Sequence, residues 1–239
     1  MSEESKETKN ENVNNEEEAK EKETEQVKSD TKSTFNNAKE SFKNVNFKQD
    51  AKGTSGYVTG MFKDPLGTLK AIVEDKKNTN FKNAIILVFV WLVVVLLTSI
   101  FGVHWTKKVV GNNILQMIAD LLAPIIGIVT YAYIVYFMQK SSKRNLTTNI
   151  TAVTTAIIPT ILVKILSVLN LFSADFARVI NPLSYFATTV SVVFLYFTTK
   201  DLMDEEDDTT FVKKYCSVQF IYFIVYFILT FLKIYIPII

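Results

Sequence analysis

The stretch AIILVFVWLVVVLLTSIFGV, residues 84–103, decides the fold class of this chain. It carries no charged residue, and its length matches the ~20 residues that an α-helix needs to cross a lipid bilayer. It is too long, and lies too far from the N-terminus, to be the apolar part of a cleaved signal peptide. The sequence therefore predicts an integral membrane protein.

Four further apolar segments follow this stretch, at about residues 114–138, 150–171, 177–198 and 215–237. Each is long enough to cross a bilayer with some tilt, and none shows the ~10-residue alternating pattern of a transmembrane β-strand. We therefore expect an all-α fold whose membrane domain, residues 83–239, contains five transmembrane helices. The fourth segment has the least distinct start, because Asn181 and Pro182 lie there, and a re-entrant pair is the alternative at that point.

Residues 1–50 differ in composition from the rest of the chain. They contain nine Lys and thirteen Asp or Glu, with the two signs interleaved and few apolar side chains between them. Such a segment has too little apolar surface to offset the entropy lost on folding. We predict a disordered, charged cytoplasmic tail here, and we expect Gly53 and Gly56 to stop any helix before the segment that follows.

The juxtamembrane segment, residues 51–82, contains the stretch DPLGTLKAIVED, which has the start signals of a short helix. Asp64 is suited to cap its N-terminus, and Pro65 to fill the first helical position, where a backbone N–H is not needed. The apolar side chains at helical spacing include Leu66, Leu69 and Ile72. We expect a helix over about residues 65–75 that lies in the membrane interface and braces the first span, the alternative being a plain linker.

Lysine and arginine residues are distributed unevenly between alternate loops. One set of loops contains Lys63, Lys70, Lys76, Lys77, Lys82, Lys140, Lys143, Arg144, Lys200, Lys213 and Lys214. The other set contains only Lys107, Lys108, Arg178 and Lys233. Because loops rich in Lys and Arg stay in the cytoplasm, the sequence predicts a multi-pass protein of the cell membrane with its N-terminus cytoplasmic and its C-terminus outside.

The residues needed for metal, cofactor or nucleophile chemistry are scarce in this sequence. The chain has one His, His104, and one Cys, Cys216, which are too few for a zinc site and exclude an intramolecular disulfide. The seven glycines are scattered and form no phosphate-binding loop. The basic residues follow the membrane ends, which gives no support to nucleic-acid binding. We predict no catalytic residue, no metal site and no cofactor.

Two charged residues fall inside predicted spans, where a charge costs ~2.5–3.5 kcal/mol on insertion scales. Asp120 in the second span and Lys164 in the third both lie roughly 10 Å from the same membrane surface, at ~1.5 Å per residue. Pro124 and Pro159 lie at matched depths in the same helices, and each is predicted to kink its helix. The two charges fit a buried ion pair that fixes helix packing, or an ion or proton path. A third alternative is that Lys164 extends outward while Asp120 faces water.

The arrangement of these segments is similar to that of a known family. The polar tail, the stretch DPLGTLKAI, the polar approach EDKKNTNFKNA and five closely spaced spans resemble the Yip-domain family, the Ypt/Rab-interacting-protein superfamily, in one of its bacterial branches. The resemblance extends from about Phe62 to the end of the chain, and KDPLG stands near the place where eukaryotic members carry an Asp-Leu-Tyr-Gly-Pro-like sequence. It implies a membrane-organising or trafficking-related role through protein partners, with no established catalytic reaction.

We therefore expect a non-enzymatic membrane protein of Yip type that organises the lipid bilayer or binds other membrane proteins or a second copy of itself. Two alternatives belong to other functional classes. One is a small transporter or channel subunit that uses Asp120 and Lys164. The other is a membrane stress sensor whose charged tail recruits a cytoplasmic partner.

Overall fold

The computed structural model describes residues 4–43, 47–75, 77–106, 113–140, 144–205 and 207–232. Within these ranges the regular backbone is helical and contains no strand, so the predicted all-α fold is confirmed. The chain forms two units, Met1–Glu40 and Ser41–Ile239. Lys76, Lys107, Lys108, Lys143 and Lys233, which contribute to the predicted orientation, lie outside the described residues.

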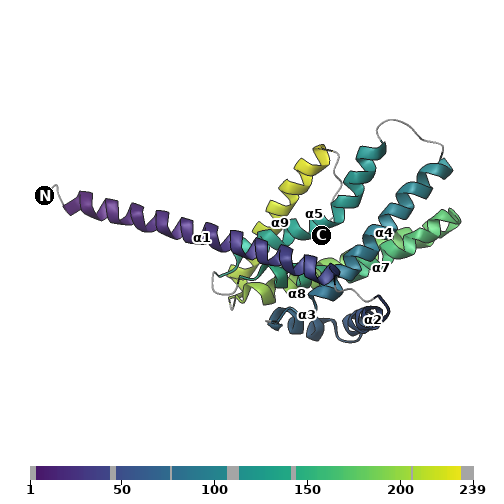
Figure 1. The fold of residues 1–239 in the computed structure, drawn as a ribbon, viewed down its shortest axis with the longest axis horizontal. Coiled ribbons are helices and arrows are strands. Elements are labelled where there is room, and N and C mark those ends of the chain that lie inside the picture. Colours follow the sequence, from purple (N-terminus) through teal and green to yellow (C-terminus); the bar gives the residue numbers. More distant parts are fainter. Residues whose placement is uncertain are drawn as a thin grey trace. The chain divides into compact units, whose positions relative to one another are not determined.

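The described residues of the first unit belong to helix α1, Glu4–Lys43, whose last three residues fall in the second unit (Figure 1). The structure gives helical backbone where the composition predicts a disordered tail. Its Glu, Lys and Ala residues are strong helix formers. A long helix with so few apolar side chains is stabilised by propensity almost alone. The free-energy difference between this helix and an unfolded tail is therefore small.

The second unit contains every helix long and apolar enough to cross a membrane. These helices are α4 (Phe81–Thr106), α5 (Asn113–Met138), the pair α6 (Leu146–Ala156) and α7 (Ile158–Leu166), α8 (Asp175–Met203) and α9 (Asp208–Phe231). A short 3₁₀ helix, η2 (Ser167–Leu171), continues α7. Four are single helices, and the bent pair forms a fifth candidate span. Each of the five predicted spans thus corresponds to one of these segments.

The third span is bent by 53° between α6 and α7. The break lies at Ile157, two residues before Pro159, which has no N–H to continue the helical hydrogen bonds. The N–H of Thr160 donates instead to the hydroxyl of Ser191 on α8, at 3.4 Å. The interruption is therefore in the third span rather than the fourth, where Asn181 and Pro182 lie inside the continuous helix α8. Pro124 also lies inside a continuous helix, α5.

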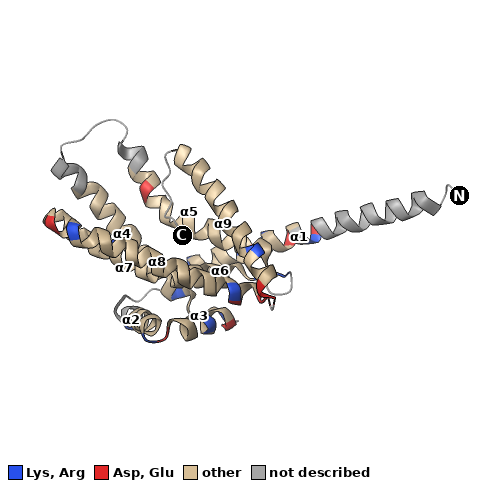
Figure 2. Ribbon diagram, turned by 180° about the vertical axis from the view of Figure 1, so that it is seen from behind, with Lys and Arg blue, Asp and Glu red and all other residues tan. Residues whose placement is uncertain are grey.

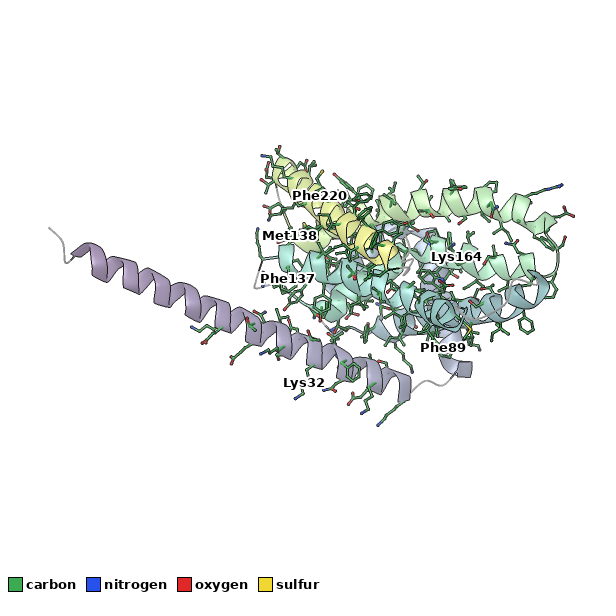
Figure 3. The ribbon with its side chains drawn as sticks, turned by 90° about the horizontal axis from the view of Figure 1, so that it is seen from above. Lys32, Phe89, Phe137, Met138, Lys164 and Phe220 are labelled. Carbon is green, nitrogen blue, oxygen red and sulfur yellow. The ribbon has the colours of Figure 1, made fainter. Side chains whose placement is uncertain are left out.

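Large apolar side chains lie on the outside of the spanning helices, and many polar ones lie inside. Phe220 of α9 is 65% exposed and Phe89 of α4 is 37% exposed (Figure 3). The buried polar residues of α6 and α8 are Thr147, Thr148, Asn149, Thr151, Thr154, Thr155, Ser191, Thr198 and Thr199. Figure 2 shows the charged residues mainly at the helix ends and on helix α3, Pro65–Glu74. This distribution is typical of helices whose outer surface contacts lipid.

Helix α2, Phe47–Lys63, runs through Gly53 and Gly56, so the expectation that these glycines end the helix is wrong. Its side chains at helical spacing pack on other helices of the second unit instead. Thr54 donates a hydrogen bond to Asn83 Oδ1 of α4 at 3.2 Å, and Tyr57 and Met61 are buried on the same side. These contacts outweigh a helix-propensity cost of ~1 kcal/mol for each glycine.

Helix α3, Pro65–Glu74, lies beside α2 (Figure 1). The carboxylate of Asp64 accepts a hydrogen bond from the N–H of Gly67 at 3.0 Å, and Pro65 occupies the first helical position. Leu69 and Ile72 are buried, in a helix that packs against α6 and α8, whereas Leu66 is 48% exposed. Leu69 and Ile72 therefore face the helical bundle, and the position of α3 in the membrane interface stays a prediction.

Candidate functional site

Three chain segments that are distant in sequence enclose a cavity of about 900 Å³ at one end of the bundle. They are α3, the α5–α6 connection and the end of α8 with the loop that follows it. We call this the loop-side cavity, and its charged lining residues include Lys70, Glu74, Arg144, Lys200, Asp201 and Glu205. Its three basic residues come from three of the Lys- and Arg-rich loops, so the structure brings these loops together at one end.

Arg144 is held against the C-terminal end of α5. Its guanidinium donates to the backbone carbonyls of Gln139 and Phe137, both at 3.3 Å, and lies 5.6 Å from the centre of the Tyr136 ring. A cation at this place satisfies carbonyl groups that have no helical partner and opposes the negative end of the helix dipole. The α5–α6 connection is therefore anchored at the cavity wall.

The conformation of the acidic loop after α8 is stabilised by interactions of its own carboxylates. Asp204 adopts a left-handed conformation with φ of 47° and ends α8, and Glu205 pairs with Lys214 of α9. Asp207 caps α9 by accepting from the N–H of Thr210 at 2.7 Å. Hydrogen bonds from Thr210 lower the pKa of the Asp207 carboxyl. The loop thus supplies negative charge at the cavity edge while fixing the start of the last span.

Helix α3 supplies the remaining wall and interacts electrostatically with α8. Lys70 and Glu74 are close enough to Asp201 for both charges to act on its carboxylate. Asp75 ends α3 and accepts from the backbone N–H of Lys77 at 3.0 Å and from that of Thr79 at 2.7 Å. Partial burial alone would raise the pKa of Asp75, but these hydrogen bonds together with that of the Thr79 hydroxyl lower it. The turn into α4 is therefore fixed by an ionised carboxylate.

The floor of the loop-side cavity is a buried amide pair. The amide groups of Gln139 and Asn149 lie 3.1–3.2 Å apart, and Gln139 Nε2 donates to the carbonyl of Leu202 at 2.8 Å. These contacts connect α6, α8 and the C-terminal end of α5. The sequence predicts a span that begins at about residue 150, which leaves Asn149 in a loop, so no pattern in the sequence identifies this pair.

Further hydrogen bonds connect the helices below this floor. Tyr131 of α5 bonds to the Thr199 hydroxyl of α8 and accepts from Gln219 of α9, both at 3.2 Å. Thr160 and Ser191 join α7 to α8 at 2.9 Å. Tyr57 of α2 bonds to Thr155 of α6. Interhelical hydrogen bonds of this kind hold membrane bundles together where apolar burial gives little preference for one packing.

Asp120 and Lys164 line a second cavity, of about 440 Å³, which we call the Asp120 cavity. Its lining also includes Trp91, Thr98, Pro124 and Asn170. Asp120 is half-buried on α5, whereas the Lys164 side chain is exposed on α7. Residues of α4 lie between these two helices at the cavity. Both charges predicted from the sequence therefore face one space, and Pro159 lies outside its lining, at the break of the third span.

Asn170 is a polar lining residue that sequence reasoning does not identify. It lies in η2, at the end of the third span, where an asparagine is ordinary on composition alone. Its Oδ1 atom is shielded from solvent and accepts no hydrogen bond from the described residues. Only the folded arrangement shows that Asn170 lines the same cavity as Asp120 and Lys164.

Metal-ligating residues are not clustered in the described part of the chain, where no group of three or more His, Cys, Asp and Glu could hold a metal ion. Cys216 is exposed on α9, and the side chain of His104 lies outside the described residues. Comparison of the chain with family models, with curated proteins and with solved structures gives no match. The resemblance to the Yip-domain family accordingly rests on the pattern of the sequence.

Proposed function

We propose that this chain is a non-enzymatic multi-pass membrane protein of Yip type that binds other membrane proteins through its loop-side cavity. The observation that supports this is the cavity wall, where Lys70, Arg144 and Lys200 alternate with carboxylates from two of the same segments. Charged groups of both signs select a polar partner by complementary charge rather than an apolar ligand. With the orientation predicted from the Lys and Arg bias, this cavity opens to the cytoplasm.

Reversing one charge of the cavity is expected to remove such a partner. We expect the tagged full-length protein, purified from its own membranes in mild detergent, to retain a specific set of membrane proteins. Lys70→Glu should lower their recovery by about tenfold, because it replaces an attractive contact by a repulsive one. Quantitative mass spectrometry of the purified complexes measures this change.

The matched control is Lys213→Glu, which makes the same substitution at an exposed position on α9 outside the cavity lining. We expect Lys213→Glu to keep the partner set of the wild-type protein. Recovery of identical partners with Lys70→Glu, or of no specific partner with the wild-type protein, would contradict binding at this cavity.

A small transporter or channel subunit is the second candidate, and the broken third span favours it. Transporters form polar sites where a spanning helix is interrupted near the middle of the membrane. Here the interruption at Ile157 lies between the two cavities along the chain, and the hydroxyl groups of Thr154 and Thr198 are buried without a partner among the described residues.

Neutralising Asp120 tests transport directly. If Asp120 lies on the pathway, the wild-type protein in liposomes should carry a flux of protons or Na⁺, and Asp120→Asn should lower it by at least about tenfold with unchanged thermal stability. The control is Asp175→Asn, which removes an exposed carboxylate from α8. A fluorescent pH or Na⁺ indicator inside the liposomes measures the flux, and an equal flux with Asp120→Asn would exclude this role.

A further inference from the structure

The surface of helix α8 divides into three sides of different chemistry, at ~100° of rotation per residue. Most of its buried residues share the side that faces the bundle, namely Ile180, Ala187, Ser191, Leu195, Thr198 and Leu202. A second side is exposed and apolar, and it comprises Val179, Leu183, Phe186, Val193 and Phe197. The third side is exposed and polar, and it comprises Asn181, Tyr185 and Thr189. We call this third side the α8 polar stripe.

The α8 polar stripe differs from the exposed surfaces of α4 and α5. On those two helices, every exposed residue whose side chain is described is apolar. The side chains of Asn181 and Tyr185 make no hydrogen bond within the described part of the chain, although both residues lie in the span predicted at 177–198. Amide and hydroxyl groups lose their hydrogen bonds to water in hydrocarbon, so spanning helices gain by pairing through them. Lipid therefore suits the apolar side of α8, whereas the α8 polar stripe suits a polar partner.

The chemistry of this stripe is self-complementary. The Asn181 carboxamide carries both donors and acceptors, so it can bond to its own counterpart, and the Tyr185 hydroxyl can do the same. The Thr189 hydroxyl donates to the carbonyl of Tyr185 at 3.0 Å and can still accept. Arg178, one turn towards the N-terminus of α8, pairs with Asp175 at 3.6 Å, so its charge adds little repulsion between two copies.

We infer that the protein forms a parallel homodimer in the membrane, in which the α8 polar stripes of two copies pack against each other. All copies enter the membrane in one orientation, so a twofold axis normal to the bilayer brings the same face of each α8 together. Asn181, Tyr185 and Thr189 are spaced four residues apart, and they form a single ridge of the kind that packs between helices. This contact goes beyond the proposed function, which places other membrane proteins at the loop-side cavity.

Cysteine cross-linking in the protein's own membranes tests which side of α8 meets the second copy. Cys216 is the only cysteine and is exposed on α9, so each variant is made in a Cys216→Ser background. Thr189→Cys places a thiol on the α8 polar stripe and keeps Asn181, whereas Leu183→Cys places one on the apolar side, about 120° away around the helix. A disulfide requires Cα atoms within about 7 Å, so we expect oxidation to give at least about fivefold more covalent dimer with Thr189→Cys than with Leu183→Cys.

The affinity of the dimer is measured with the full-length protein in liposomes. Energy transfer between labelled copies at several protein-to-lipid ratios gives the dissociation constant. Asn181→Leu is expected to raise this constant by about tenfold, as the loss of one or two interhelical hydrogen bonds would. Asn181→Gln keeps the amide and should retain most of the pairing. Phe186→Leu changes a residue of the apolar side that is 66% exposed and should match the wild type.

Equal cross-linking of Thr189→Cys and Leu183→Cys, or energy transfer no greater than a random distribution gives, would overturn this homodimer. A cross-link of Thr189→Cys to a different protein in place of a second copy would also contradict it. Asn181 is exposed, so a wild-type unfolding temperature of Asn181→Leu shows that a loss of pairing is not a loss of folding. Because partner capture is tested at Lys70, a failure of either proposal leaves the other unaffected.

Discussion

Replacing Leu69 by alanine is expected to lower the free energy of unfolding by about 2–5 kcal/mol, the usual range for a fully buried leucine. Leu69 has no exposed surface, in a helix whose neighbours are α6 and α8. The shortened side chain leaves a cavity that the surrounding helices fill only in part. Thermal or denaturant unfolding of the detergent-solubilised protein, followed by tryptophan fluorescence, measures the loss.

The control for this experiment lies one turn earlier on the same helix. Leu66 is 48% exposed, so Leu66→Ala is expected to change the free energy of unfolding by no more than about 0.5 kcal/mol. A larger loss with Leu66→Ala than with Leu69→Ala would show that α3 is held by the membrane interface, as the sequence pattern predicts, and not by the bundle.

Tyr131→Ala is expected to have an effect of similar size, about 3–5 kcal/mol, because a buried aromatic ring is removed from the centre of the bundle. Tyr131 has no exposed surface, and its ring lies edge-on to Tyr222 with the centroids 5.5 Å apart. Its hydroxyl joins Thr199 of α8 to Gln219 of α9. Its removal should therefore loosen α9 as well as reduce overall stability, which limited proteolysis and thermal unfolding can detect separately.

Tyr131→Phe separates packing from hydrogen bonding. The ring stays in place while Thr199 and Gln219 lose a shared partner, so we expect a loss of about 1–3 kcal/mol. Tyr185→Ala is the matched control, because Tyr185 is 79% exposed on α8. If Tyr185→Ala destabilised the protein as much as Tyr131→Ala, the bundle would not depend on this central tyrosine.

The parts of the fold that follow from local sequence could be predicted. A run of apolar residues such as 84–103 predicts a transmembrane helix by itself, since a helix satisfies all of its backbone hydrogen bonds within one segment in a bilayer. The continuation of helix α2 through Gly53 and Gly56 could not be predicted in this way, because α2 is stabilised by contacts of Thr54 and Tyr57 with other helices. The burial of Leu69 and Ile72 on α3 also depends on contacts with other helices. The spacing of the apolar residues in this segment is equally suited to contact lipid or protein, so it could not identify which of the two they meet.

The candidate site was predictable only through its charges. Asp120 and Lys164 are conspicuous in apolar segments, and matched depth places them on one side of the membrane. Neutral polar residues give no comparable signal, so Asn170 and the amide pair of Gln139 and Asn149 become apparent only when distant segments are brought together. The order of the spans along the chain does not determine which helices pack side by side. The presence of α4 residues at this cavity, beside α5 and α7, therefore could not be predicted either.

The bend at Ile157 gives the third span two separate attachments. Thr148 and Asn149 on α6 line the loop-side cavity, and Lys164 on α7 lines the Asp120 cavity. A single joint of 53° therefore connects the walls of two sites on opposite sides of the break. If a ligand at one site favours a different angle at this joint, thermodynamic reciprocity requires that a ligand at the other site affect the first by the same factor. Communication across the membrane would then need no moving domain, only a change in the direction of one short helix.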